Sequence, residues 1–129
     1  MHKCSILWFF WAVGLCGEAR PAAPLVWVEA EHFRDPGGWT SDTQFVDQMG
    51  SPYLLAHGLG KPVAAARTQV DFPAPGTYRL WVRTKDWVPS HHPGQFKVIF
   101  DGVPAAAVFG TQGKGWNWQD GGKVEVKGK

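Results

Sequence analysis

The sequence predicts an all-β domain, built as an antiparallel β-sandwich of jelly-roll type. Segments with apolar residues at every second position recur at short intervals, as expected for strands with one buried face. Turn-forming residues separate these segments, since 16 glycines and 10 prolines occur among 129 residues. No segment has the apolar periodicity of a convincing amphipathic helix.

The first predicted strand lies near the start of the domain, in residues 25–31. Val26 and Val28 alternate there with larger or charged residues. A long stretch follows at residues 34–61, rich in Gly, Asp, Ser and Pro with only scattered hydrophobic residues. We expect a loop there, and a loop of that length in a compact domain usually shapes a ligand site.

Three further strands are predicted in residues 68–72, 77–84 and 95–102. Each has one apolar face, and we expect these faces to share a single core: Val70, Phe72, Tyr78, Leu80, Val82, Phe96, Val98 and Phe100. The dipeptide "DG" at 101–102 predicts a tight hairpin, with a return strand in residues 103–109.

A last strand is predicted in "KVEV", residues 123–126. No further strand follows to pair with it, so the sheet would keep an unpaired edge. We therefore expect the chain to be a fragment, a β-sandwich over residues 25–129 that lacks its last strands.

Residues 1–19 have the layout of a secretory signal peptide, with a basic start, an apolar run and small residues. The apolar run of about a dozen residues is shorter than the roughly 20 that a membrane span needs. Lipid anchoring at Cys16 is disfavoured, because Leu15 stands where a small residue is required. Both cysteines, Cys4 and Cys16, lie in this segment, so the exported domain is held by its core or a metal. The sequence predicts a secreted or periplasmic protein.

Composition and the absence of known motifs limit the classes of function that the sequence supports. The chain is 44% hydrophobic, 19% charged and carries a formal net charge of +2, which suits one globular domain. Without a basic run, nucleic acid and anionic membranes are not indicated as partners. The sequence has no nucleophile elbow, P-loop or dinucleotide fingerprint. We therefore expect a non-catalytic domain.

A pair of carboxylates, Glu29 and Glu31, lies in the first predicted strand. Residues two apart in a strand project to the same side, roughly 7 Å apart at the backbone. The pair could supply part of a calcium site, since Ca²⁺ takes several oxygen ligands. The other interpretation is ion pairs on a solvated face, with His32, Arg79 or Arg83 as partners.

Four tryptophans lie in glycine- or proline-rich connections, close to three aspartates: Trp39, Trp87, Trp116 and Trp118, with Asp42, Asp86 and Asp120. Indole faces that stack on sugar C–H surfaces, with carboxylates for the hydroxyls, are what a glycan site requires. The ligand site is therefore predicted at Trp39, Asp86, Trp87, Trp116 and Asp120.

Two of these tryptophans also fit a packing role. Trp116 and Trp118 are two residues apart, so an extended segment would point both rings to one side. We expect this pair to brace the end of the sandwich, while Trp39 and Trp87 border the open site. The adjacent His91 and His92 are expected in an exposed polar loop, because successive side chains diverge.

Three segments, "VWVEAEHF", "PAPGTYRLWVRT" and "FKVIFDG", resemble carbohydrate-binding modules of the galactose-binding-like β-sandwich type. The longer run "FVDQMGSPYLLAHGLGKPV", with "TKDWVP" and "GWNWQDGG", is similar to the module at the start of secreted bacterial FAD-dependent oxidoreductases of the planctomycete kind. The likeness extends from about Val26 to Val126.

This resemblance implies a jelly-roll accessory module with structural calcium at Glu29 and Glu31. It also implies sugar contacts from loop aromatic residues, here Trp39, Trp87 and Trp116. The family continues with further core strands, one of which supplies another acidic calcium ligand, and with a flavin domain; this chain has neither, so no residue here is expected to bind FAD. Two functions follow: a glycan-binding module, or a structural module that packs against the catalytic domain of a parent oxidoreductase.

Overall fold

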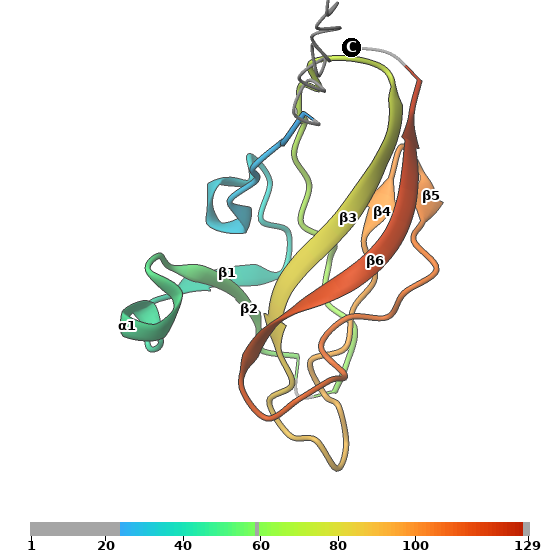
Figure 1. The fold of residues 1–129 in the computed structure, drawn as a ribbon. Coiled ribbons are helices and arrows are strands. Elements are labelled where there is room, and N and C mark those ends of the chain that lie inside the picture. The colour runs from blue at the N-terminus through green and yellow to red at the C-terminus, as the bar shows by residue number, and fades with distance from the viewer. Residues whose placement is uncertain (1–23, 59, 128–129) are drawn as a thin grey trace, which may run out of the picture.

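The computed structural model describes residues 24–58 and 60–127. The predicted signal peptide and Cys16 lie outside these residues. The described chain is mostly β, with one short α-helix and one 3-10 turn (Figure 1). Its elements in order are η1 (Ala30–His32), β1 (Trp39–Asp42), α1 (Val46–Met49), β2 (Tyr53–Ala56), β3 (Gly76–Lys85), β4 (Ile99–Phe100), β5 (Val103–Pro104) and β6 (Trp116–Val126). These strands pair as three antiparallel two-stranded sheets, so the predicted antiparallel β-rich fold is confirmed.

The longest sheet is the ribbon of β3 and β6, which twists along the whole molecule (Figure 1). The prediction of a strand at residues 77–84 is confirmed by β3. The last strand is longer than predicted: it begins at Trp116, and "KVEV" pairs with the first part of β3. The register shifts between Leu80 and Trp81 and leaves Gly121 of β6 as the extra residue of a β-bulge.

The β4–β5 hairpin confirms the turn predicted at "DG". Asp101 and Gly102 have φ angles of 47° and 80°. A two-residue hairpin turn of type I′ requires such positive φ values at both central residues. The hairpin is shorter than predicted, because beyond it only an isolated bridge joins Phe96 to Phe109.

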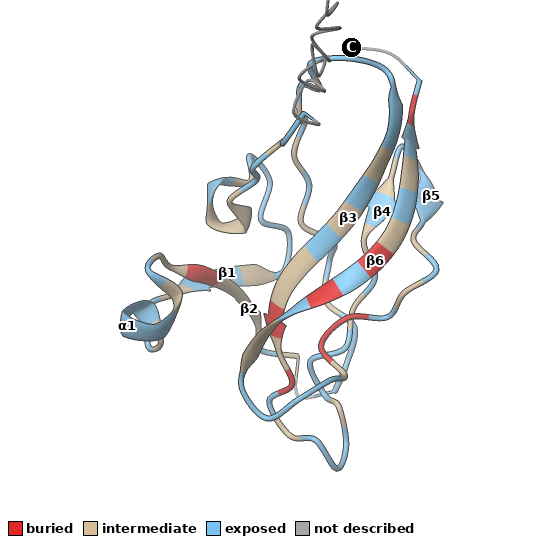
Figure 2. Ribbon diagram, in the orientation of Figure 1, coloured by how far each residue is buried: buried red, intermediate tan, exposed pale blue. Residues whose placement is uncertain are grey.

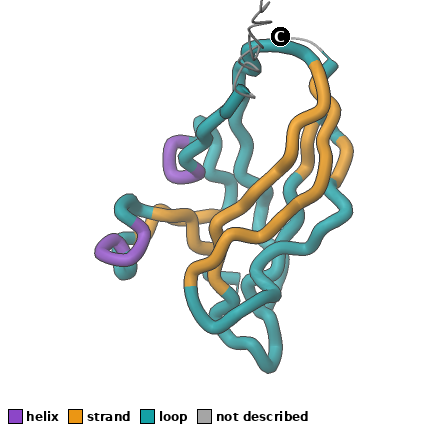
Figure 3. The backbone as a smooth tube through the Cα atoms, viewed as in Figure 1, coloured by secondary structure: helices purple, strands orange, loops and turns teal. Residues whose placement is uncertain are grey.

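Two predicted strands are absent from the described residues. Residues 25–31 end in the 3-10 turn η1, and residues 68–72 are extended without a ladder. Alternation of apolar residues specifies a face, but a strand also needs a hydrogen-bonded neighbour, and neither segment forms a ladder within the described residues. Loop segments thus run beside the ribbon where these two strands were expected (Figure 3).

The long stretch at 34–61 is not a plain loop. It contains the β1–β2 hairpin and the helix α1. With four residues, α1 is too short to show a helical periodicity in the sequence. Arg83 of β3 fixes this unit by donating hydrogen bonds to the carbonyls of Gln48 and Met49, at 2.8 and 3.0 Å. The side chain thereby satisfies carbonyls at the end of α1.

The apolar face of β3 is predicted correctly, but other segments bury it only in part. Every residue of the predicted core is half-buried, and the buried apolar residues in the described part of the chain are Tyr53, Phe109 and Val126 (Figure 2). Phe109 stacks on Phe96 with ring centroids 5.6 Å apart, and Phe72 lies edge-on to Tyr78 at 4.8 Å. The core is therefore a set of aromatic contacts along one face of the ribbon.

Candidate ligand site at the end of the ribbon

The candidate site lies where β3 ends and β6 begins. Lys85, the last residue of β3, pairs with Trp116, the first of β6. The indole of Trp116 lies edge-on to Tyr53 of β2, 4.9 Å between centroids, and 6.2 Å from Phe45. Together with Trp87, two residues beyond Lys85, these side chains form what we call the aromatic cluster: Phe45, Tyr53, Lys85, Trp87 and Trp116.

Trp87 is the exposed member of this cluster, with 55% of its surface accessible. Phe45 meets it edge-on, with 6.1 Å between the ring centroids. The Lys85 ammonium lies 3.7 Å from the Phe45 centroid and 5.1 Å from that of Trp87. Such cation–π and edge contacts hold the indole in place while leaving much of it open to a flat apolar ligand surface.

Tyr53 and Trp116 form the inner part of the cluster. Tyr53 is buried, and Trp116 is half-buried with its indole nitrogen enclosed and unbonded within the described residues. Burial, together with the Asp42 carboxylate opposite on β1, raises the pKa of the Tyr53 hydroxyl above its ordinary value. The Tyr53 hydroxyl is therefore protonated at neutral pH.

A buried acid lies directly beside Trp87. Asp86 is 2% exposed, and its Oδ2 lies 2.7 Å from Nδ1 of His92. Its other oxygen, Oδ1, has no hydrogen-bond partner in the described part of the chain. The backbone amides of His91 and His92 both donate to the Val88 carbonyl at 2.9 Å, which folds this loop back toward Asp86. The expectation of an exposed polar loop holds for His91, while His92 is intermediate in exposure, with 41% of its side chain accessible and Nδ1 on the buried Asp86.

Of the predicted ligand residues, the structure brings Asp86, Trp87 and Trp116 together and gives the other two different neighbours. Trp39 is half-buried edge-on against Phe96, 5.7 Å between centroids. Its predicted position at an open rim is therefore not observed.

Asp120 binds Arg79 across the ribbon, with Arg79 Nε 3.1 Å from Oδ1, and accepts the Gly122 amide at 2.9 Å. The Arg79 guanidinium, followed by the Gly122 amide, lowers the pKa of this carboxyl below its ordinary value. Asp120 is thus an ionised partner of arginine and does not face the aromatic cluster through any observed contact.

The expected pairing of Trp116 and Trp118 as braces is half right. Trp116 packs against Tyr53, whereas Trp118 is 49% exposed, and its one aromatic partner within the described residues is Trp27, edge-on at 5.8 Å. Both rings leave the same side of β6, but the cover from Phe45 and β2 extends only as far as Trp116. The two-residue spacing determines that both tryptophan side chains point to the same side of the strand, but it does not determine how deeply each is buried.

The carboxylates of Glu29 and Glu31 do not share a strand face. Glu29 precedes η1 and Glu31 lies within it, while Glu29 Oε1 accepts the Trp27 indole N–H at 2.5 Å. The arginines considered as their partners bind elsewhere, Arg79 to Asp120 and Arg83 to backbone carbonyls. Among residues 24–58 and 60–127, no group of three or more His, Cys, Asp or Glu side chains is placed to hold a metal.

Sequence reasoning missed four residues around the site: Phe45, Tyr53, Lys85 and His92. Phe45 and Tyr53 are aromatic residues among the scattered hydrophobic residues of the stretch at 34–61, which is a usable signal for an anchored loop. Nothing in the pattern marks Lys85 or His92, because their roles depend on where the loops fold. In the part of the chain that the structure describes, no helix is long and apolar enough to cross a membrane.

No known protein family, curated protein or solved structure matches the chain. The likeness to carbohydrate-binding modules therefore rests on the sequence motifs alone.

Proposed function

We propose that this chain is a non-catalytic binding module that holds a glycan at the aromatic cluster. The observation that carries the proposal is the Trp87 indole, which is more than half exposed yet held by Phe45 and Lys85. An ordered, exposed indole is the side chain best suited to stack on the C–H face of a sugar ring. Ordering it before binding reduces the entropy lost on association.

Polar groups beside Trp87 would serve the sugar hydroxyls. Asp86 is too deeply buried to touch a ligand, and it fixes His92 through Nδ1 instead. The second ring nitrogen of His92 has no partner within the described residues, so it is available to a hydroxyl. The Lys85 ammonium, on the same side as the indole, is a further donor.

The sequence motifs extend this proposal beyond the site. They support a secreted jelly-roll sandwich of the galactose-binding-like type, with Glu29 and Glu31 as ligands of a structural calcium. They also support attachment to an FAD-dependent oxidoreductase, in which case the redox chemistry belongs to the parent enzyme.

The test compares two tryptophans of similar exposure, Trp87 at the cluster and Trp118 outside it. Wild type, Trp87→Ala and Trp118→Ala are measured for binding on a glycan array and for melting temperature. We expect Trp87→Ala to lose binding by at least tenfold with little change in melting temperature, and Trp118→Ala to bind as wild type. Equal losses in the two variants, or no binding by the wild type, would refute glycan binding at this site.

A second function is favoured by a different surface. Trp81 and Trp118 project from the same face of the ribbon and are 51% and 49% exposed, with the 64% exposed Trp27 against Trp118. Exposed indoles gathered on one face are typical of protein interfaces. A structural module would use this face to pack against the catalytic domain of its parent, and a wild type that binds no glycan would support that function.

A further inference from the structure

We propose that the groove between residues 25–29 and 68–73 binds an extended peptide strand from a separate partner protein. We call this feature the strand groove. Its two walls run side by side in opposite directions, one leading toward η1 and the other toward β3 (Figure 1). The proposal is independent of glycan binding, because the strand groove shares no residue with the aromatic cluster.

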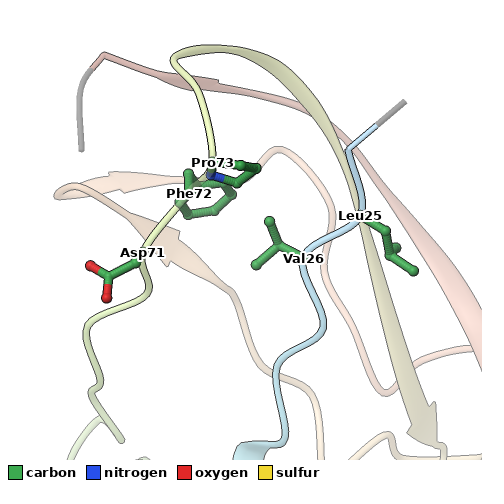
Figure 4. Close-up of a pocket in the computed structure, with 5 residues that line it drawn as sticks. All are labelled: Leu25, Val26, Asp71, Phe72 and Pro73. Atoms are coloured by element: carbon green, nitrogen blue, oxygen red, sulfur yellow. The ribbon is translucent and has the colours of Figure 1, made fainter. Parts of the chain in front are cut away.

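The groove consists of two adjoining hollows that share Val26 and Asp71. The first, of about 480 Å³, is lined by Leu25, Val26, Asp71, Phe72 and Pro73 (Figure 4). The second, of about 390 Å³, continues along residues 26–29 and 68–71 to His32 and Phe33. One end of the groove is therefore mainly apolar, whereas the other end carries polar side chains.

Backbone groups on both walls are left without partners. Within residues 24–58 and 60–127, the N–H groups of 25–28 and 68–72 and the carbonyls of 25–28 and 68–73 form no backbone hydrogen bond. Backbone N–H and C=O groups are obligatory hydrogen-bonding groups, so a ligand that supplies both kinds along its length gains from binding them. A side chain, a sugar or a lipid does not supply such a regular series.

A single antiparallel bridge lies beyond one end of the two walls. Asp35 and Arg67 form an antiparallel bridge, with hydrogen bonds of 3.0 and 2.6 Å in the two directions. Beyond this bridge the two segments form no further backbone hydrogen bond to each other within the described residues, and η1 interrupts the first segment before it reaches residues 25–29. Both walls have the alternating sequence pattern that is typical of strands.

The side chains of the groove define the chemistry of the partner. Val26 and Phe72 favour apolar residues at alternate positions of the bound strand, since such residues share one face. Glu29 and Asp71 line the polar part, so a lysine or arginine in the bound strand would face carboxylates. The expected ligand is an extended segment with alternating Val or Ile and at least one basic residue.

The experiment uses the purified chain and a fluorescent ten-residue peptide of alternating valine and threonine that carries one lysine. Its control is the same peptide with every second backbone nitrogen methylated, which removes donors and leaves the side chains unchanged. We expect saturable binding in fluorescence anisotropy, weakened at least tenfold by methylation. No saturable binding, or equal binding of the two peptides, would overturn the proposal.

A pair of protein variants locates the binding. Val26→Asp places a charge in the apolar end of the groove, while Val103→Asp changes an exposed valine of β5. We expect a tenfold or greater loss of peptide binding for Val26→Asp and none for Val103→Asp. Equal effects in both variants, or a dimer in sedimentation velocity that Val26→Asp dissociates, would contradict a separate partner strand.

Discussion

Nδ1 of His92 lies 2.7 Å from Oδ2 of Asp86, a residue with only 2% of its surface accessible to solvent. Burying a charged group is unfavourable unless it is hydrogen-bonded or paired. This contact therefore ties the loop after β3 to the end of the strand, beside the exposed Trp87. It is the one contact to the Asp86 carboxylate observed within the described residues.

Replacing His92 by Asn should lower the free energy of unfolding by about 1–3 kcal/mol, because a buried carboxylate loses its hydrogen-bonded partner. Asparagine is chosen since it tolerates the left-handed φ of 47° at this position. Urea unfolding checks the loss. The matched control is His91→Asn, whose exposed side chain bonds only the carbonyl of Ser90 and should change stability little. A loss as large in the control would mean that the Asp86 contact is not the cause.

The sequence predicted the parts of the fold that depend on local patterns. β3 and the turn at Asp101–Gly102 were both predicted, because alternation and left-handed turn residues are local properties. The strands expected at residues 25–31 and 68–72 are absent, since a ladder also depends on a neighbour distant in sequence.

The same limit applies to the candidate site. Asp86, Trp87 and Trp116 were predicted from residue type and loop setting. Phe45 and Tyr53 were not, because they reach the site only when β2 folds against the start of β6. Trp118 has sequence neighbours of the same kind as Trp116. The two differ in burial because Phe45 and β2 cover Trp116 and do not extend to Trp118.

Adding a methyl group at Gly121 should destabilise the ribbon. A Cβ there would lie 2.7 Å from both Leu80 Cδ2 and Phe109 Cζ, closer than van der Waals contact allows. We expect Gly121→Ala to cost about 1–3 kcal/mol, as overpacking does in other cores. Chemical unfolding provides the measurement, with Gly115→Ala as control because no atom beyond its two chain neighbours lies within 4 Å of its Cβ position. If the two variants are equally stable, the packing of Phe109 against β6 is wrong.

The loss of stability when a core residue is truncated to alanine should increase with the burial of that residue. Phe109 is fully buried, whereas Leu80 is half-buried despite its central place on β3. We expect Phe109→Ala to cost about 3–5 kcal/mol and Leu80→Ala to fall at or below the lower end of the usual 2–5 kcal/mol. Thermal unfolding of both variants tests this order. Phe109→Leu serves where the alanine variant does not fold, and a larger cost at Leu80 than at Phe109→Ala would contradict the thin core.

The Arg79–Asp120 pair should make part of the stability dependent on acid pH. Arg79 holds the pKa of Asp120 below its ordinary value, so the folded state favours the ionised carboxylate. The resulting stabilisation is present above the unfolded pKa, about pH 4, and is lost as the pH falls through the lower folded pKa. The effect should be small and weaken with salt, because both side chains are solvent-accessible.

Removing either partner should abolish this acid-dependent part. Asp120→Asn and Arg79→Gln are compared with wild type by urea unfolding at pH 7 and at several values below about pH 4. In both variants the free energy of unfolding should decrease less steeply with acid than in wild type, since the paired carboxylate is gone or has lost its arginine. The double variant should match each single variant, as expected for two residues acting through one contact. An unchanged acid slope in Arg79→Gln would show that the Gly122 amide, and not the guanidinium, sets the pKa of Asp120.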